Sequence, residues 1–228
     1  MRVNSLLLIS GAFAAFRRDA VLTVGGFDPD CLVEDYELIH RMQRYGRVND
    51  LGWQVRVVGR AVATTDAPGT VGDFVRQRRR WFGGFLQTQY WYREMVGNRR
   101  YGWLGLVMLP VKAADTMEPI YGLSAVTILV GLVATGHGAV LVPVGAIVLA
   151  KLMLDLVGDF WTVRLYRRWT GLTTTTGLFG TVLAAILDPF TFTPLRHLAA
   201  VTGWWQFLSG RQTWTPQRRD SYSAAVDQ

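Results

Sequence analysis

The chain of 228 residues is organised around one stretch, Arg76-Gln77-Arg78-Arg79-Arg80-Trp81-Phe82-Gly83. This stretch separates a polar first third from a long apolar remainder. Within it, Gln77, Arg80 and Trp81 stand three and four residues apart, so on a helix an amide, a guanidinium and an indole share one face. Such a face can hold a polyphosphate and stack on a sugar ring. The stretch also fits a basic flank before a membrane helix, and the residues alone leave both interpretations open.

Composition indicates a membrane protein. Half of the residues (50%) are hydrophobic, 12% are aromatic, and the formal net charge is +7. The basic residues cluster beside apolar segments, which favours an anionic membrane surface and a phosphate-bearing substrate. No nucleic-acid-binding signature accompanies the charge, so we expect no nucleic-acid partner. The single cysteine, Cys31, excludes an internal disulfide and is interpreted as a loop or packing residue.

The first residues admit two interpretations. Met1 to Phe16 combines one charge, a short apolar run and small residues, as a secretory signal does. Alternatively, Leu6 to Ser10 forms a buried strand that ends at Gly11. We favour the strand, because the following residues continue as a cytosolic α/β domain and Arg17-Arg18 would be unusual just after a cleavage site.

Alternation and helical periodicity then predict a mixed α/β domain. Residues 53 to 66 alternate as a β-strand pair does, around a Gly59-Arg60 turn. Short and long helices are predicted over residues 18–24, 34–46 and about 70–93, the first stopped by Gly25-Gly26. The second helix carries an apolar stripe of Leu38, Ile39, Met42 and Tyr45.

Two acids, Glu34 and Asp35, stand at the start of the second predicted helix. The helix dipole and free N–H groups favour the ionised carboxylate there, which fixes a base but lowers its basicity. Acids at helix starts are also ordinary capping residues. These two residues alone therefore leave capping and catalysis open.

Several motifs together resemble a known enzyme family. They are Gly11-Ala12-Phe13, Gly25-Gly26-Phe27-Asp28, Val33-Glu34-Asp35, Asp66-Ala67-Pro68 and Gln77-Arg78-Arg79-Arg80-Trp81, with Trp214-Thr215-Pro216-Gln217-Arg218 near the end. Their order and spacing resemble the carboxyl-terminal half of processive family 2 glycosyltransferases, the membrane synthases of cellulose, chitin, hyaluronan and poly-N-acetylglucosamine. The resemblance implies a GT-A-like fold and nucleotide-sugar chemistry.

The resemblance also implies a role for each matching residue. Asp35 matches the general base that takes a proton from the acceptor hydroxyl. Gln77 and Arg80 match residues that contact the donor pyrophosphate, Trp81 would lie under the acceptor sugar, and Glu34 belongs to the same substrate-binding set. One departure is Val33, where the family has a threonine, which puts a local hydrogen bond in doubt.

A second departure concerns the donor half. The family's amino-terminal half carries the nucleotide-binding strand and a D-x-D motif that holds Mg²⁺ or Mn²⁺, and neither precedes Met1. Asp28-Pro29-Asp30 has the right spelling, but it follows a Gly-Gly-Phe turn and is interpreted as turn chemistry. We therefore predict no metal site in this chain. The cation ligands, and possibly a second chain carrying the donor half, lie outside it.

The remainder predicts a multi-pass membrane region. Residues 103–117 are interrupted by Pro110, Lys112 and Asp115 and suit an interface or kinked helix, whereas residues 120–135 and 139–161 are each apolar enough for a crossing. Lys151 and Asp155 permit an internal ion pair. Residues 177–208, broken by Asp188-Pro189 and Pro194, suit a kinked crossing, a re-entrant pair or an interface helix. We expect two crossings, with three as the alternative.

The predicted organisation is a partial GT-A-like α/β domain with an interfacial helix (1–98), transmembrane and interface helices (99–210) and a polar cytosolic tail (211–228). The predicted function is an inverting glycosyltransferase of the inner membrane, with its catalytic part cytoplasmic, which extends a polysaccharide from a nucleotide sugar. We expect this donor to be a UDP-sugar. This chain by itself would be inactive without the donor half. The alternative is a non-catalytic membrane scaffold or accessory subunit derived from such a synthase.

Overall fold

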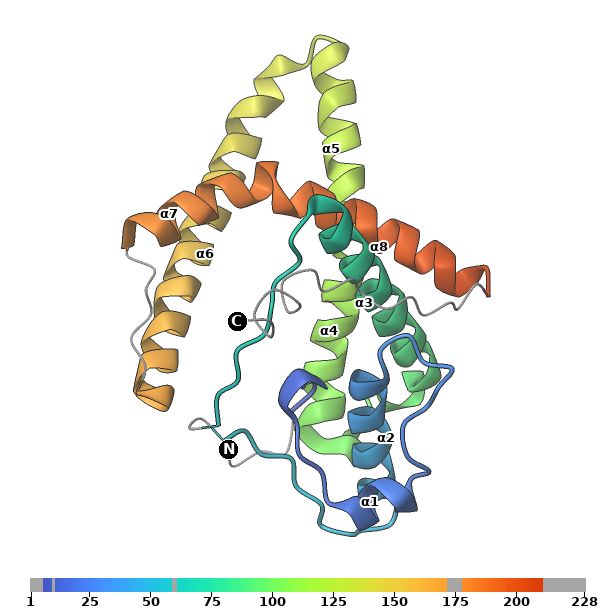
Figure 1. The fold of residues 1–228 in the computed structure, drawn as a ribbon. Helices are drawn as coiled ribbons and strands as arrows, with labels where there is room; N and C mark the ends of the chain where they lie inside the picture. Colours follow the sequence, from blue (N-terminus) through green and yellow to red (C-terminus); the bar gives the residue numbers. More distant parts are fainter. Residues whose placement is uncertain (1–5, 10, 59–60, 172–177, 211–228) are drawn as a thin grey trace, which may run out of the picture.

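The computed structural model describes residues 6–9, 11–58, 61–171 and 178–210. Eight α-helices occur in these ranges: α1 (Arg18–Thr23), α2 (Glu34–Val48), α3 (Val71–Trp91), α4 (Leu109–Thr116), α5 (Glu118–Ala134), α6 (Leu141–Thr170), α7 (Leu178–Leu187) and α8 (Phe192–Leu208). Short 3₁₀ turns cover Gly11–Phe13, Arg93–Met95, Arg99–Tyr101, Gly138–Val140 and Asp188–Phe190, and a π-helical turn covers Leu104–Met108. Figure 1 shows α1 and α2 at one end of the molecule and the α5–α6 hairpin at the other.

The prediction of an α/β fold is wrong. The described residues form helices and irregular segments, and none of them is in a strand. Residues 6–9, 51–58 and 61–68 are extended but pair with no neighbouring strand, so the predicted strands at 6–10 and 53–66 do not form within the described residues. The physical reason is that alternation specifies only which side chains share a face, whereas a strand also needs a neighbour for its backbone N–H and C=O groups. The Gly59-Arg60 turn lies outside the described residues.

The helices before residue 95 form where local signals predict them. The backbone N–H of Asp73 donates to the Thr70 hydroxyl (3.1 Å) and caps α3, and α1 ends before Gly25 and Gly26, whose φ angles are 91° and 80°. A positive φ strains any residue with a side chain, so the Gly-Gly pair stops the helix. In α2 the predicted stripe is partly correct, because Leu38 and Ile39 are buried while Tyr45 stays 36% exposed.

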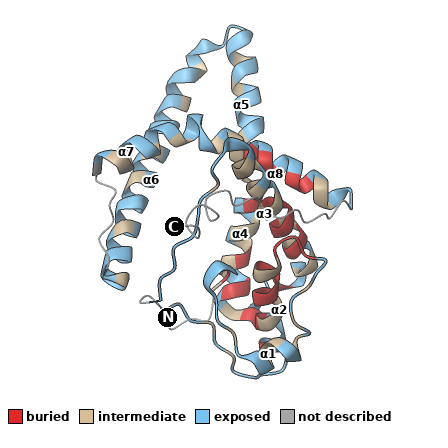
Figure 2. Cartoon of the chain, viewed as in Figure 1, coloured by how far each residue is buried: buried red, intermediate tan, exposed pale blue. Residues whose placement is uncertain are grey.

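The main core lies between α2, α3 and α4. Its buried residues are Leu7, Leu32, Val33, Tyr36, Phe85, Met95, Tyr101, Leu104 and Leu109. Figure 2 shows buried residues gathered along α2, α3 and the middle of α8, while α5, α6 and α7 are largely exposed. The first third of the chain thus buries its apolar side chains against α4, which belongs to the region predicted to meet the membrane.

The two helices α3 and α8 pack in parallel, side by side (Figure 1). Phe74 meets Phe192 near their first turns (ring centroids 5.6 Å apart), and Tyr90 meets Phe207 near their last turns (6.2 Å). Between these contacts, a Cβ atom added to Gly83 would lie 2.8 Å from the backbone oxygen of Gly203. Because real Cβ atoms do not approach so closely, glycine is what allows the two backbones to touch. The region 177–208, for which a kinked crossing, a re-entrant pair and an interface helix were left open, thus ends in a helix packed on α3.

The predicted kink near residue 117 is confirmed. The π-turn and α4 lead into α5 at an angle of 44°, with Pro110 and Pro119 in the first turns of the two helices. Within the described residues, Gly138–Thr170 is the one helical stretch long and apolar enough to cross a membrane, and the bent pair Leu104–Thr116 and Glu118–Ala134 is a second only when counted as one span. The two crossings predicted at 120–135 and 139–161 thus reduce to one clear candidate.

Candidate active site

The loop 30–33, which directly precedes the acidic pair Glu34 and Asp35, is fixed to one face of α3. The Leu32 backbone N–H donates to Oε1 of Gln87 (3.0 Å), and Nε2 of Gln87 donates to the carbonyl oxygen of Asp30 (2.9 Å). The Sγ atom of Cys31 lies 3.8 Å from the Thr88 hydroxyl. Gln87 and Thr88 are fully buried. Since a buried amide that loses its partners costs free energy, this arrangement fixes residues 30–32 firmly against α3.

The contact between Val33 and Gly84 brings the loop closer still. A Cβ atom added to Gly84 would lie 2.8 Å from Cβ and 3.0 Å from the backbone nitrogen of Val33. Only glycine leaves room for this approach, because any side chain would push the loop away from α3. Val33 stands where the resemblance expects a threonine, and its buried isopropyl group packs in the main core.

Asp35 lies in the first turn of α2, directly after this anchored loop. The Tyr36 backbone N–H donates to its Oδ1 atom (2.8 Å), and a Cβ atom added to Gly11 would lie 2.6 Å from Oδ2. The carboxylate therefore lies between a helix N-terminus and the backbone of Gly11, and it is half-buried. Glu34 precedes it in the same turn and is also half-buried.

The other predicted site residues lie on α3 beside this loop. Nη1 of Arg80 donates weakly to the carbonyl oxygen of Leu32 (3.5 Å), and Trp81 packs against the main core that includes Leu32 and Val33. Gln77, half-buried, lies one turn earlier on the same face. The structure thus brings Arg80 and Trp81 against residues 32–33, and Asp35 follows two residues later. The helical arrangement of Gln77, Arg80 and Trp81 is confirmed, while their roles stay predictions.

Buried polar contacts hold α2 in place beneath Asp35. Glu37, which is 1% exposed, pairs with the guanidinium of Arg41 (Nη2 to Oε2, 2.6 Å) and accepts a hydrogen bond from the Tyr92 hydroxyl. Nη1 of Arg41 also donates to the carbonyl oxygen of Val24 (2.7 Å), which ties α2 to the end of α1. Burial and the adjacent Glu37 carboxylate raise the pKa of Tyr92. The tyrosine therefore remains a neutral donor to Glu37.

Two further titratable groups near the loop are neutral at pH 7. Burial lowers the pKa of His40 to about 4, and its Nδ1 atom lies 2.7 Å from the carbonyl oxygen of Tyr36. Burial raises the pKa of Cys31 to about 11, so the thiol is not a reactive thiolate. The interpretation of Cys31 as a packing residue is consistent with its burial beside Thr88.

No set of three or more His, Cys, Asp or Glu side chains in the described residues is arranged to hold a metal ion. The Asp28-Pro29-Asp30 sequence forms a turn, in which the Asp30 backbone N–H donates to Oδ1 of Asp28 (2.9 Å). The Asp28 carboxylate is thus engaged with its own backbone. The described side chains do not fit a divalent cation site of the kind that the resemblance implies for the complete enzyme.

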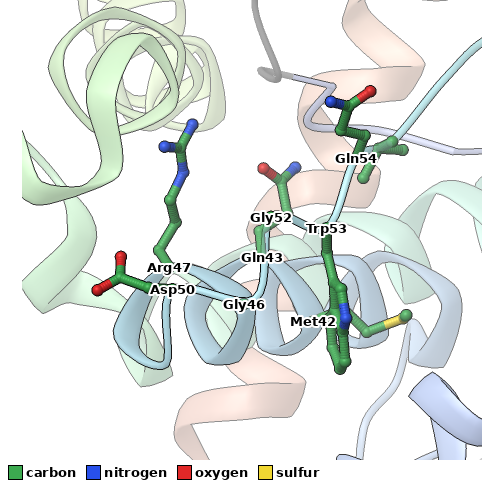
Figure 3. Close-up of a pocket in the computed structure, with 9 residues that line it drawn as sticks. Met42, Gln43, Gly46, Arg47, Asp50, Gly52, Trp53 and Gln54 are labelled. Carbon is green, nitrogen blue, oxygen red and sulfur yellow. The ribbon is translucent and has the colours of Figure 1, made fainter.

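A pocket of about 310 Å³ lies at the opposite end of α2 (Figure 3). Gln43, Arg47, Asp50, Trp53 and Gln54 are among its lining residues. Twelve residues separate Asp35 from Arg47, which corresponds to roughly 18 Å along a helix. A larger open cavity of about 1110 Å³ has residues 13–17 and 51–58 among those that line it. Neither cavity is lined by Asp35, Arg80 or Trp81.

Three residues of this site escaped the sequence prediction: Gly84, Gln87 and Thr88. They continue the helical face of Gln77, Arg80 and Trp81, since Gly84 follows Arg80 by four residues and Gln87 by seven. A glutamine and a threonine that recur at this spacing inside an apolar segment were the available signal. Their partners in the loop could not be inferred, because the contacts span 55 and 57 residues.

Comparisons with known proteins indicate the family of the chain. A chitin synthase 2 of Mycosarcoma maydis is 47% identical over 47 residues, which cover 18% of this chain and 4% of that protein. This chain thus spans a small part of the curated relative that it matches. No solved structure matches the chain. The model of the glycosyl transferase family group 2 matches residues 1–210, which is most of the sequence. On that match, the chain belongs to the family 2 glycosyltransferases.

Proposed function

We propose that this chain forms the acceptor side of a membrane-embedded, inverting glycosyltransferase that extends a polysaccharide from a UDP-sugar. Membership of the family supports a nucleotide-sugar donor and a sugar acceptor. The match to a chitin synthase supports a polysaccharide product. The carrying observation is the contact of Val33 with Gly84, because it fixes the start of α2 beside the face of α3 that bears Arg80 and Trp81.

In this proposal Asp35 is the general base. Its carboxylate accepts the proton of the acceptor hydroxyl as that oxygen forms a bond to the anomeric carbon of the donor sugar. The bond between the anomeric carbon and the diphosphate oxygen breaks from the opposite side, and its electron pair leaves with the nucleoside diphosphate. Attack from one face and departure from the other invert the anomeric configuration.

The residues of α3 would stabilise the departing group and position the acceptor. The Arg80 guanidinium offers paired N–H donors to the negative charge that grows on the diphosphate, and Gln77 offers a neutral donor one turn away. Trp81 offers a flat ring on which a sugar of the acceptor can stack. Glu34 would contact substrate from the first turn of α2. Among the described residues, Arg80 has one weak hydrogen-bond partner, the carbonyl oxygen of Leu32, so we propose that its other donors bind the diphosphate.

A divalent cation, Mg²⁺ or Mn²⁺, would neutralise diphosphate charge when bound. The described residues do not fit such a site. We therefore propose that its ligands, and the groups that bind the nucleotide base, come from outside the described residues, with a second chain as one source. The residues assigned above act on the acceptor hydroxyl and the departing diphosphate.

The membrane placement rests on the exposed apolar helices. None of the α6 residues is buried in the structure, and the helix is long enough to cross a bilayer. Arg164, Arg167 and Arg168 at its end favour the cytoplasmic side. We propose that α6, with the bent α4–α5 pair, embeds the chain in the inner membrane while α2 and α3 face the cytoplasm. Under this placement, the polar site stays in water beside the lipid surface.

The test introduces Asp35→Asn into the chromosomal gene of the native organism. Polymer synthesis from labelled UDP-sugars is then measured in isolated membranes. We expect synthesis to fall about 10²- to 10⁴-fold, the usual contribution of a general base. Asp30→Asn is the matched control, because Asp30 is exposed and only its backbone contacts Gln87. Synthesis retained in Asp35→Asn would remove Asp35 from the role of base. Synthesis that persists when the whole chain is deleted would make the chain a non-catalytic scaffold.

A further inference from the structure

The parallel interface between α3 and α8 is built in layers. Phe74 and Phe192 form the first layer, with ring centroids 5.6 Å apart. Two turns further along each helix, Phe82 and Ala200 meet in a buried cluster with Trp204. Residues four apart on a helix lie on one side, so the residues of α3 and α8 halfway between these layers also face each other. Those residues are Arg78 and Arg196.

This intermediate layer therefore places two cations together between apolar layers. Burial and, after it, the charge of Arg196 lower the pKa of Arg78, which agrees with the proximity of the two guanidinium groups. The Nε atoms of both arginines are buried and have no hydrogen-bond partner. Like charges in a partly buried interface repel each other, and the repulsion is stronger there than in water.

The acids around the layer do not balance its charge. Glu118 contacts Arg196 (3.3 Å) and also approaches Nε2 of His197 (3.9 Å), so one carboxylate serves both side chains. Asp73 pairs with Arg76 and accepts from Thr70, and Asp188 accepts from the Thr193 hydroxyl (2.7 Å). Among the described residues, no carboxylate forms an ion pair with Arg78. The guanidinium of Arg78 instead lies over the rings of Trp81 (4.2 Å to the ring centroid) and Phe74 (5.1 Å to the ring centroid).

The layer remains open to solvent on one side. The Arg196 side chain is 38% exposed, and Arg78 is half-buried. Adjacent residues of a helix point about 100° apart, so Arg78 lies on a different side of α3 from Gln77 and Arg80. The layer thus points away from Gln77 and Arg80 and adjoins the face that contacts the loop only at Trp81, whose ring the Arg78 guanidinium covers.

We propose that Arg78 and Arg196 together bind a phosphate group, either of a lipid headgroup or of a soluble phosphate compound. Paired guanidinium groups match the geometry and charge of phosphate oxygens, and aromatic rings on one side fix the orientation of Arg78. The exposed aromatic side chains of Phe190 and Phe192 at the start of α8 are adjacent to the layer, as the apolar part of a lipid requires. This proposal does not depend on the catalytic role of Asp35.

The test measures the midpoint of thermal unfolding of the full chain in detergent micelles at constant ionic strength. Sodium pyrophosphate is added in one series and phosphatidylglycerol, with phosphatidylcholine as the neutral comparison, in another. A ligand that binds only the folded state at about 100 times its Kd raises the midpoint of a chain of this size by roughly 5 °C or more. A rise with pyrophosphate identifies a soluble phosphate, and a rise with phosphatidylglycerol alone identifies a headgroup.

Variants locate the bound phosphate. We expect Arg78→Gln and Arg196→Gln each to lose the rise, while Arg79→Gln keeps it, because Arg79 is exposed on α3 and carries the same charge. With pyrophosphate as the probe, all variants are compared in an Arg80→Ala background, which removes the proposed diphosphate contact at Arg80. The proposal is overturned if neither probe shifts the midpoint of the chain that retains Arg78 and Arg196, if the rise survives in either arginine variant of the layer, or if Arg79→Gln removes it.

Discussion

The two sides of α3 pack against their neighbours by different means. Toward the loop 30–33, Gln87 forms two hydrogen bonds to the backbone, and Gly84 admits Val33. Toward α8, aromatic rings and the meeting of Gly83 with Gly203 hold two helices together. Hydrogen bonds of fixed direction position a loop to within a fraction of an ångström, whereas apolar layers mainly contribute stability. Substitutions on the first side should therefore change catalysis, and those on the second side should change stability.

After Asp35→Asn, the largest effect should follow from Arg80→Ala on the loop side. Loss of the guanidinium removes the proposed donor to the departing diphosphate, which costs about 10²- to 10³-fold in polymer synthesis. Inhibition of isolated membranes by added nucleoside diphosphate should weaken in parallel. Arg79→Ala is the control, because its side chain is exposed on the same helix. Unchanged inhibition in Arg80→Ala would return Arg80 to the role of a membrane-flanking charge.

Because His40 is buried and neutral in the folded chain, we expect the fold to lose stability in acid. Burial lowers its pKa from 6.5 to about 4, so the unfolded chain binds a proton in this interval that the folded chain does not. The stabilisation by neutral His40 is therefore complete above about pH 6.5 and falls as the pH drops toward 4, by about 3 kcal/mol in total. Thermal unfolding of the purified chain between pH 7 and pH 4.5 measures the slope. A slope that is as steep in His40→Gln would assign the effect to other groups.

Two glycines test the comparison directly. A methyl group in Gly84→Ala would press on the backbone of Val33 and displace the segment before Asp35, at a cost of about 1–3 kcal/mol. In Gly203→Ala the methyl group would lie 2.9 Å from the backbone nitrogen of Gly83, at a similar cost. We expect both variants to unfold at lower temperature. Only Gly84→Ala should also lose polymer synthesis per folded molecule, and an equal loss in both would erase the distinction between the two sides.

The smallest effect should come from the surface ion pair between Arg44 and Glu94. Nε of Arg44 lies 2.8 Å from Oε1 of Glu94, and the two side chains are 50% and 45% exposed. Water and salt screen such a pair, so Arg44→Gln should cost less than about 1 kcal/mol and leave synthesis unchanged. Thermal unfolding at low and high salt measures it. A larger cost would show that the end of α2 depends on this contact.

The sequence predicted where helices form better than it predicted which segments pack against one another. Thr70 caps α3 and Gly25-Gly26 ends α1, because both signals act within a few residues. The ion pair of Lys151 with Asp155 (2.5 Å) on α6 was likewise predicted from a local spacing. Strands at 53–66 were predicted wrongly, since alternation cannot supply the neighbouring strand that a ladder requires. The packing of α8 on α3 was not predicted, because a periodic apolar stretch fits a membrane crossing and a helix interface equally well.

For the candidate site, the sequence predicted the motif residues but not the residues that position the loop beside them. The spacing of Gln77, Arg80 and Trp81 predicted their shared face, and the resemblance to the family predicted that Asp35 belongs with them. The side chain of Gln87 and the missing side chain of Gly84 position the loop, but their contacts depend on how residues some 50 apart approach each other. The two-arginine layer likewise exists only in the packed helices, because four other described α-helices separate Arg78 on α3 from Arg196 on α8 in the chain.

The central claim is that the start of α2 and the loop-facing side of α3 form one active site. A double-mutant cycle on polymer synthesis tests it most directly, with Asp35→Asn, Arg80→Ala and the double variant compared in membranes from the native cell. Residues that act on the same transition state are strongly non-additive, so the double variant should be little slower than the slower single variant. If the two losses multiply in full, Asp35 and Arg80 act independently, and the single site proposed here is contradicted.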